Sequence, residues 1–68
     1  MNIIKILDTE RNKKKLSYSE LAKMLGISRQ NLNYHLKNLK NNKISFSVDQ
    51  VKKICKILKI DVSIFFTD

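Results

Sequence analysis

Residues 17–36, Ser-Tyr-Ser-Glu-Leu-Ala-Lys-Met-Leu-Gly-Ile-Ser-Arg-Gln-Asn-Leu-Asn-Tyr-His-Leu, decide the fold. Ser17 is a favourable helix N-cap, and Glu20, three residues later, can complete a capping box with it. Apolar residues then recur at the spacing of one helix face, at Leu21, Ala22 and Leu25. Gly26 ends this helix, because glycine takes the left-handed backbone conformation without steric cost.

A second helix begins directly after this glycine. Ile27 is expected to turn inward and Ser28 to cap the helix, which then runs from Arg29 to about Lys40. Its buried stripe is formed by Leu32, Leu36 and Leu39. The outer face carries side chains that can pair with the edges of bases, namely Arg29, Gln30, Asn33 and Tyr34. The stretch therefore predicts two short helices joined by a tight corner.

Residues 17–36 resemble the helix-turn-helix of the Cro and phage-repressor (lambda-repressor-like) family. The family pattern is roughly Thr-Gln-x-Glu-Leu-Ala-x-x-Leu-Gly-[Val/Ile]-Ser-x-x-x-[Ile/Val]. It is matched here by Glu20-Leu21-Ala22, by Leu25-Gly26-Ile27-Ser28 and by the apolar Leu32. The resemblance is moderate over residues 47–66 and weak over the first helix and residues 37–46. It implies an all-α, five-helix lambda-repressor-like domain that spans residues 1–68.

Length and charge limit the possibilities. Sixty-eight residues allow one domain with a modest core. A net charge of +8 favours nucleic acid as the partner, then an anionic membrane surface, although a lysine-rich surface also serves solubility. The single cysteine excludes an internal disulfide and fits a reducing cytoplasm. No apolar run approaches the roughly 20 residues that a bilayer requires, and no signal peptide is visible.

The flanking segments predict three further helices. Residues 2–14 form the first, with Ile3, Ile4 and Leu7 inward and Lys5, Asp8, Glu10 and Arg11 outward. Its basic end, residues 11–15, either complements the helix dipole or contacts phosphate. Ser47 and Gln50 open the fourth helix with a second capping box. Its inner stripe is Val48, Val51, Ile54, Cys55 and Leu58, and its solvated face is Lys52, Lys53, Lys56 and Lys59.

The last short helix, capped by Asp61, ends in two consecutive phenylalanines. Both rings cannot point into one small core, so one of Phe65 and Phe66 is expected to be buried with Phe46 and Leu58. The other, with Ile64, is a candidate dimer contact. The alternative is that both rings are half-buried within one subunit. The candidate interface is therefore Ile64, Phe65 and Phe66.

The resemblance also implies which residues touch DNA. Arg29 suits guanine and Gln30 suits adenine, with Asn33 and Tyr34 one turn further along the major groove. The candidate phosphate ligands are Tyr18, Ser28, Lys37, Lys40, Asn41 and Lys43. Tyr18 stands where the family usually has Gln. The family's Glu-Asn-Gly is absent from residues 37–45, which are expected to fray into a loop that either contacts phosphate or is merely solvated.

The sequence thus predicts a DNA-binding transcriptional regulator, a Cro-like phage or prophage repressor. It would bind a palindromic operator as a homodimer, with the two recognition helices about 34 Å apart. We expect a cytoplasmic, nucleoid-associated protein of bacterial or phage origin, either free-standing or a fragment of a larger repressor. The alternatives are an antitoxin, a restriction-system controller, or a protein-interaction module that uses the same polar helix face.

No catalytic function is predicted, because no acid, base, nucleophile or metal ligands are spaced to act together. His35 is the only histidine and is expected to flank its helix without binding a metal. We expect no cofactor, no metal and no small-molecule substrate.

Overall fold

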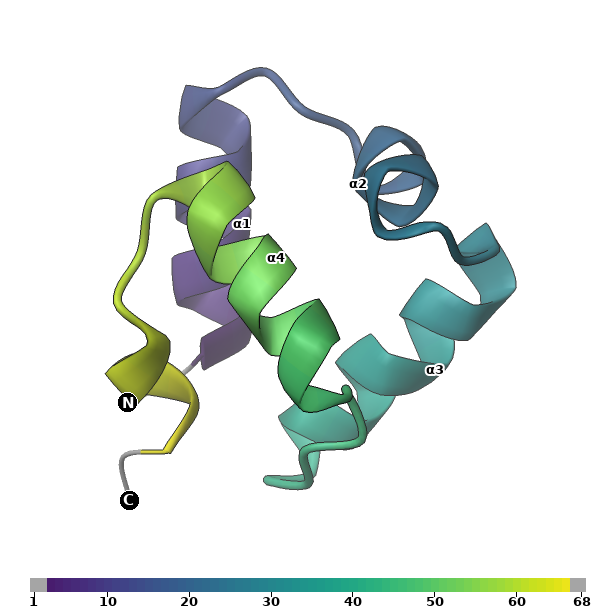
Figure 1. Ribbon diagram of the computed structural model, residues 1–68, viewed down its shortest axis with the longest axis vertical. Coiled ribbons are helices and arrows are strands. Elements are labelled where there is room, and N and C mark those ends of the chain that lie inside the picture. The colour runs from purple at the N-terminus through teal and green to yellow at the C-terminus, as the bar shows by residue number, and fades with distance from the viewer. Residues whose placement is uncertain (1–2, 67–68) are drawn as a thin grey trace.

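The computed structural model describes residues 3–66, which form four α-helices and one 3-10 turn without a strand. The elements are α1 (Ile3–Lys13), α2 (Tyr18–Leu25), α3 (Arg29–Lys40), α4 (Val48–Leu58) and η1 (Val62–Phe65). In Figure 1, α4 lies in front of α1, and α2 and α3 stand beside them, joined by a tight corner. The all-α prediction is confirmed in this range, but the prediction of five α-helices is wrong.

The fifth predicted helix is only the turn η1. Asp61 caps it by accepting from the Ser63 amide at 2.9 Å. Its backbone bonds join residues three apart, Ile64 to Asp61 and Phe66 to Ser63. This is the pattern of a 3-10 helix, which is favoured only in short pieces. Four residues provide too few bonds to offset the cost of starting an α-helix.

One apolar core joins all of these elements. The most deeply buried large side chains come from each α-helix, namely Leu7, Leu21, Leu32, Ile54 and Leu58. The same cluster includes Phe46, which precedes α4, and Phe65 from η1. Because α3 contributes Leu32 and Leu39 to this core, its opposite face is directed away from the rest of the molecule.

The predicted corner between α2 and α3 is confirmed. Ser17 and Glu20 form the reciprocal capping box at the start of α2. Gly26 has φ 73° and ψ 27°, in the left-handed region, and its amide donates to the carbonyls that end α2. Ser28 Oγ accepts from the Asn31 amide at 3.0 Å and so starts α3. Each of these capping contacts joins residues three or four apart, so the sequence pattern alone was sufficient to locate it.

The fourth helix also begins as predicted, with a capping box between Ser47 and Gln50. Val48 was placed wrongly on its inner stripe. Its side chain is 68% exposed, because it is the first residue of α4 and no described element covers it. The other four stripe residues are buried, and the lysines at 52, 53, 56 and 59 are exposed.

The basic end of α1 is mainly engaged within the molecule. Arg11, predicted to face outward, has a side chain only 17% exposed, and its Nη1 donates to the Leu16 carbonyl at 2.8 Å. Lys14 Nζ donates to the Leu58 carbonyl at 2.9 Å, and Lys13 pairs with Glu10 at 3.2 Å. These bonds tie the end of α1 to its neighbours. They favour the structural interpretation of residues 11–15 over phosphate contact.

The segment after α3 is a closed turn and does not fray as expected. The Lys43 amide donates to the Asn38 carbonyl at 2.8 Å, and Asn42 takes a left-handed φ of 60°. Ser45 Oγ accepts from Asn38 Nδ2 and also lies within hydrogen-bond distance of His35 Nδ1. The His35 ring stacks on Phe46 at 4.5 Å between centroids. His35 therefore holds this turn against α3.

The two terminal phenylalanines divide as predicted. Phe65 is buried at 4% exposure in the cluster that holds Phe46 and Leu58, whereas Phe66 is 65% exposed. Phe65 is therefore no longer a candidate for the dimer interface, because its ring already packs within the subunit. Ile64 is half-buried against the core.

Candidate nucleic-acid interface

The outer face of α3 carries the predicted base-reading residues. Leu32 and Leu39 fix the inner face of this helix in the core. All four candidates are exposed, and each lies three or four residues from another, a spacing that places side chains on one helix face: Arg29, Gln30, Asn33 and Tyr34. The structure therefore brings these side chains together on an exposed ridge, and their individual roles stay predictions.

Positive charge accumulates in the part of the chain that contains this ridge. Residues 21–48 contain no Asp or Glu and include five cationic side chains, Lys23, Arg29, Lys37, Lys40 and Lys43. The amide end of α3 adds positive potential, since a helix N-terminus carries about half an elementary charge. No acidic residue lies in its first turn to neutralise that potential. The region is therefore suited to a polyanion.

The candidate phosphate ligands lie in three places. Lys37 and Lys40 line a cleft of about 400 Å³ between α1 and α3, whose wall also includes Tyr18. Asn41 and Lys43 lie in the exposed turn that follows α3. Ser28 is exposed at the other end of the helix; its oxygen accepts from the Asn31 amide, so its hydroxyl proton remains for an acceptor such as phosphate.

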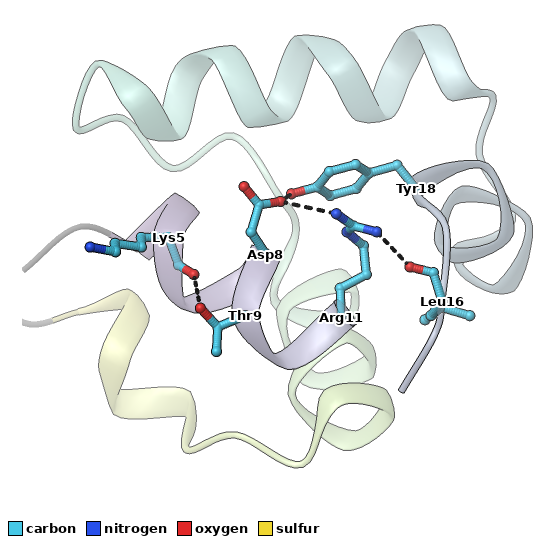
Figure 2. Close-up of polar contacts among 6 residues, drawn as sticks. All are labelled: Lys5, Asp8, Thr9, Arg11, Leu16 and Tyr18. Carbon is cyan, nitrogen blue, oxygen red and sulfur yellow. Dashed lines mark hydrogen bonds and ion pairs between the residues drawn. The ribbon is translucent and has the colours of Figure 1, made fainter. Parts of the chain in front are cut away.

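Tyr18 is held by α1, an arrangement that the spacing of residues did not indicate. Figure 2 shows its hydroxyl donating to Asp8 Oδ1, while the Arg11 guanidinium lies 4.2 Å from the centre of its ring. Arg11 Nη2 also reaches Asp8 Oδ1 at 3.4 Å. Burial, and then the hydrogen bond to Asp8, raise the pKa of Tyr18, so the hydroxyl keeps its proton at neutral pH.

This network changes the expected role of Tyr18. A tyrosine hydroxyl has one proton to donate, and here Asp8 accepts it. A bond donated from Tyr18 to phosphate would require this contact to break. The network therefore favours a structural role for the Tyr18 hydroxyl, and its contact with phosphate stays a prediction.

Arg29, the first residue of α3, contacts both helices of the corner. Its Nε donates to Asn33 Oδ1 at 3.0 Å, and its Nη1 donates to Ser19 Oγ on α2 at 3.4 Å. Its guanidinium carbon lies 5.3 Å from the centre of the Tyr18 ring. Ser19 was not identified from the sequence, because its contact joins residues ten apart across a corner whose angle the pattern does not specify.

Residues 3–66 contain no group of three His, Cys, Asp or Glu side chains placed to hold a metal ion. None of the helices in this range combines the length and the apolar composition needed to cross a bilayer.

Comparisons with known proteins address the family directly. The family model for the Cro/C1-type HTH DNA-binding domain matches residues 6–63. The comparisons with curated proteins and with solved structures gave no match. The matched range includes α2, the corner at Gly26, α3 and α4 in full, together with most of α1. Since this range spans most of the chain, the protein belongs to the family of Cro/C1-type helix-turn-helix DNA-binding domains.

Proposed function

We propose that this protein is a sequence-specific repressor of transcription of the Cro type, acting as one DNA-binding domain over residues 1–68. The observation that carries the proposal is the outer face of α3. Side chains that can hydrogen-bond to the edges of bases are exposed on this face. The surrounding stretch, residues 21–48, contains cationic residues and no acidic ones. A protein that reads a polyanionic duplex needs this combination.

In the proposed complex, the N-terminal half of α3 enters the major groove. Arg29 donates to guanine O6 and N7, and Gln30 pairs with adenine, each worth about 1–3 kcal/mol of discrimination when bidentate. Tyr34, 61% exposed one turn further along, packs on a thymine methyl or reaches a phosphate. Backbone phosphates are held by the remaining members of the predicted set, Ser28, Lys37, Lys40, Asn41 and Lys43.

The proposed active form is a homodimer on a palindromic operator. One small module buries only about 600–1,000 Å² on DNA, so two linked copies are needed for strong binding. The exposed Phe66 ring and the half-buried Ile64 provide apolar surface at the C-terminal end for this contact. Repression follows when the dimer occupies a promoter. Such a protein would act in the cytoplasm of a bacterium, encoded by the bacterium or by a phage.

Selection of bound duplexes from a random pool tests this proposal. We expect a symmetric consensus with half-sites about one helical turn apart. The double variant Arg29→Ala/Gln30→Ala should lose the consensus but keep its fold, because both side chains are exposed. The matched control Lys53→Ala removes one exposed positive charge from α4 and should keep the consensus. A pool without enrichment would refute sequence-specific binding.

The salt dependence of binding tests the phosphate contacts. Each neutralised phosphate contributes about −0.9 to the slope of log K against log salt. If Lys37, Lys40 and Lys43 each hold one phosphate, they contribute about −2.7 per subunit. Lys40→Ala then makes the slope shallower by about 0.9 per subunit, or about 1.8 for the dimer. A slope near zero, or one that Lys40→Ala leaves unchanged, would refute these contacts.

A further inference from the structure

Arg29, an exposed base-reading candidate, is not a free side chain. Its Nε donates to Asn33 Oδ1 at 3.0 Å, one turn along the same helix. Its Nη1 donates to Ser19 Oγ at 3.4 Å, on the preceding helix. The face of Tyr18 lies 5.3 Å from the guanidinium carbon and limits its motion on a third side. The guanidinium is therefore oriented by α2 and α3 together, in the absence of DNA.

The contact with Asn33 changes what that residue can do. An asparagine that reads adenine accepts from N6 through Oδ1 and donates to N7 through Nδ2. Here Oδ1 faces Arg29 Nε, which fixes the orientation of the amide. Asn33 also lines the cleft between α1 and α3, beside Asp8 and Tyr18, so it stands at the flank of the exposed ridge. Both observations favour a role for Asn33 in holding the Arg29 side chain over direct contact with a base.

Arg29 keeps enough donors to read guanine while it is held. A guanidinium has five N–H groups in a rigid fork, and the two contacts use one on Nε and one on Nη1. The remaining three are one on Nη1 and two on Nη2, and a bidentate contact with guanine O6 and N7 requires two. A side chain ordered in advance loses less entropy on binding, which strengthens the contact without adding a new one.

We propose that Ser19 and Asn33 are positioning residues that hold Arg29 for one guanine of the operator. Specificity at that base pair then depends on three side chains from two helices. The proposal rests on the proposed DNA-binding function, and it assigns a new role to Ser19 and a different role to Asn33. Gln30 and Tyr34 have no part in this arrangement.

The test measures relative affinities for duplexes that differ at single operator base pairs. Arg29→Ala identifies the base pair that Arg29 reads. Ser19→Ala and Asn33→Ala should each lower the preference at that same base pair by about 2- to 12-fold, the range for one immobilised side chain. Preferences at the other base pairs and the stability of the fold should be unchanged. The matched controls Asn31→Ala and Ser63→Ala change exposed residues of the same types and should leave the preference at the Arg29 base pair unchanged.

Two further variants separate positioning from direct reading. Asn33→Asp keeps an acceptor for Arg29, so it should retain the preference at the Arg29 base pair while weakening binding to every duplex by charge repulsion. In an Arg29→Ala background, Asn33→Ala should have no additional effect on specificity. If Asn33 reads adenine itself, Asn33→Ala will remove the preference at a different base pair and Asn33→Asp will not preserve it, which would overturn the proposal.

A measurement without DNA completes the test. The order parameter of the Arg29 Nε–H, measured by NMR relaxation in the free protein, should fall in Asn33→Ala and Ser19→Ala but not in Asn31→Ala. Equal order in all variants would refute the positioning role. A wild type with no base preference would refute the proposed function and this inference together. A preference that Arg29→Ala abolishes and both positioning variants leave intact would refute this inference alone.

Discussion

The substitution Gly26→Ala tests whether the corner between α2 and α3 has the conformation described. Gly26 has φ +73°, and a Cβ built there meets nothing within 4 Å. The free-energy cost of the substitution therefore comes from backbone strain at residue 26 and not from a steric clash of the new methyl group. A left-handed L-residue costs about 1–2 kcal/mol. Alanine also restricts the unfolded chain, which offsets about 0.4–1 kcal/mol. We expect a net loss of roughly 1 kcal/mol in the free energy of unfolding.

Urea denaturation with equal m-values for both proteins measures this loss. Gly26→Asn is the matched comparison, and its loss should be smaller because asparagine tolerates the left-handed region better than alanine. Folded Gly26→Ala should bind DNA as the wild type does, since the new methyl group faces open space and leaves the helix angle unchanged.

Two outcomes would refute this reasoning. A loss above about 3 kcal/mol would exceed the backbone term and mean that the new side chain does meet its surroundings. A stabilised Gly26→Ala would mean that residue 26 is not left-handed, because only the restriction of the unfolded chain would then remain.

Three other predictions follow from single residues. Lys59 caps the C-terminal end of α4 with φ 56°, in the left-handed region that glycine adopts without steric cost. Lys59→Gly should therefore raise the free energy of unfolding by about 0.5–1 kcal/mol, and a decrease would contradict the assigned conformation. Hydrogen bonds from the Ser17 amide and then from its hydroxyl lower the pKa of Glu20 below that of an ordinary glutamate. The ionised side chain therefore stabilises the fold at pH values above the ordinary pKa, and this contribution is lost as the pH falls through the pKa of the folded state. Glu20→Gln should flatten this part of the stability curve in acid denaturation, and an unchanged curve would exclude Glu20 as its source. Phe66→Ser should weaken self-association in sedimentation equilibrium without lowering monomer stability, because the ring is exposed; an unchanged dimer constant would locate the interface elsewhere.

The parts of the fold that could be predicted depend on short-range chemistry. Ser17, Glu20 and Gly26 each act within one helical turn, so their spacing was sufficient to locate the corner. The exposed face of α3 followed from the position of its leucines. The predictions that were wrong depend on contacts between elements. Val48 fits the inner stripe by periodicity, yet exposure at a helix end depends on which neighbour covers it.

The unpredicted part of the site depends on how helices cross. Tyr18 reaches Asp8 and Arg11 because α1 and α2 meet at an angle that no residue spacing encodes. For the same reason, Ser19 could not be connected with Arg29. By contrast, the contact between Arg29 and Asn33 joins residues four apart on one helix, so the sequence contained a signal for it.

The central claim is that α3 is the surface that meets DNA. Titration of ¹⁵N-labelled protein with a selected duplex, followed by backbone amide chemical shifts, tests it most directly. The largest changes should fall in residues 28–37 and in the turn that follows α3, while the exposed lysines of α4, Lys52, Lys53 and Lys56, should change little. Changes centred on those α4 lysines, with residues 28–37 unaffected, would contradict the account.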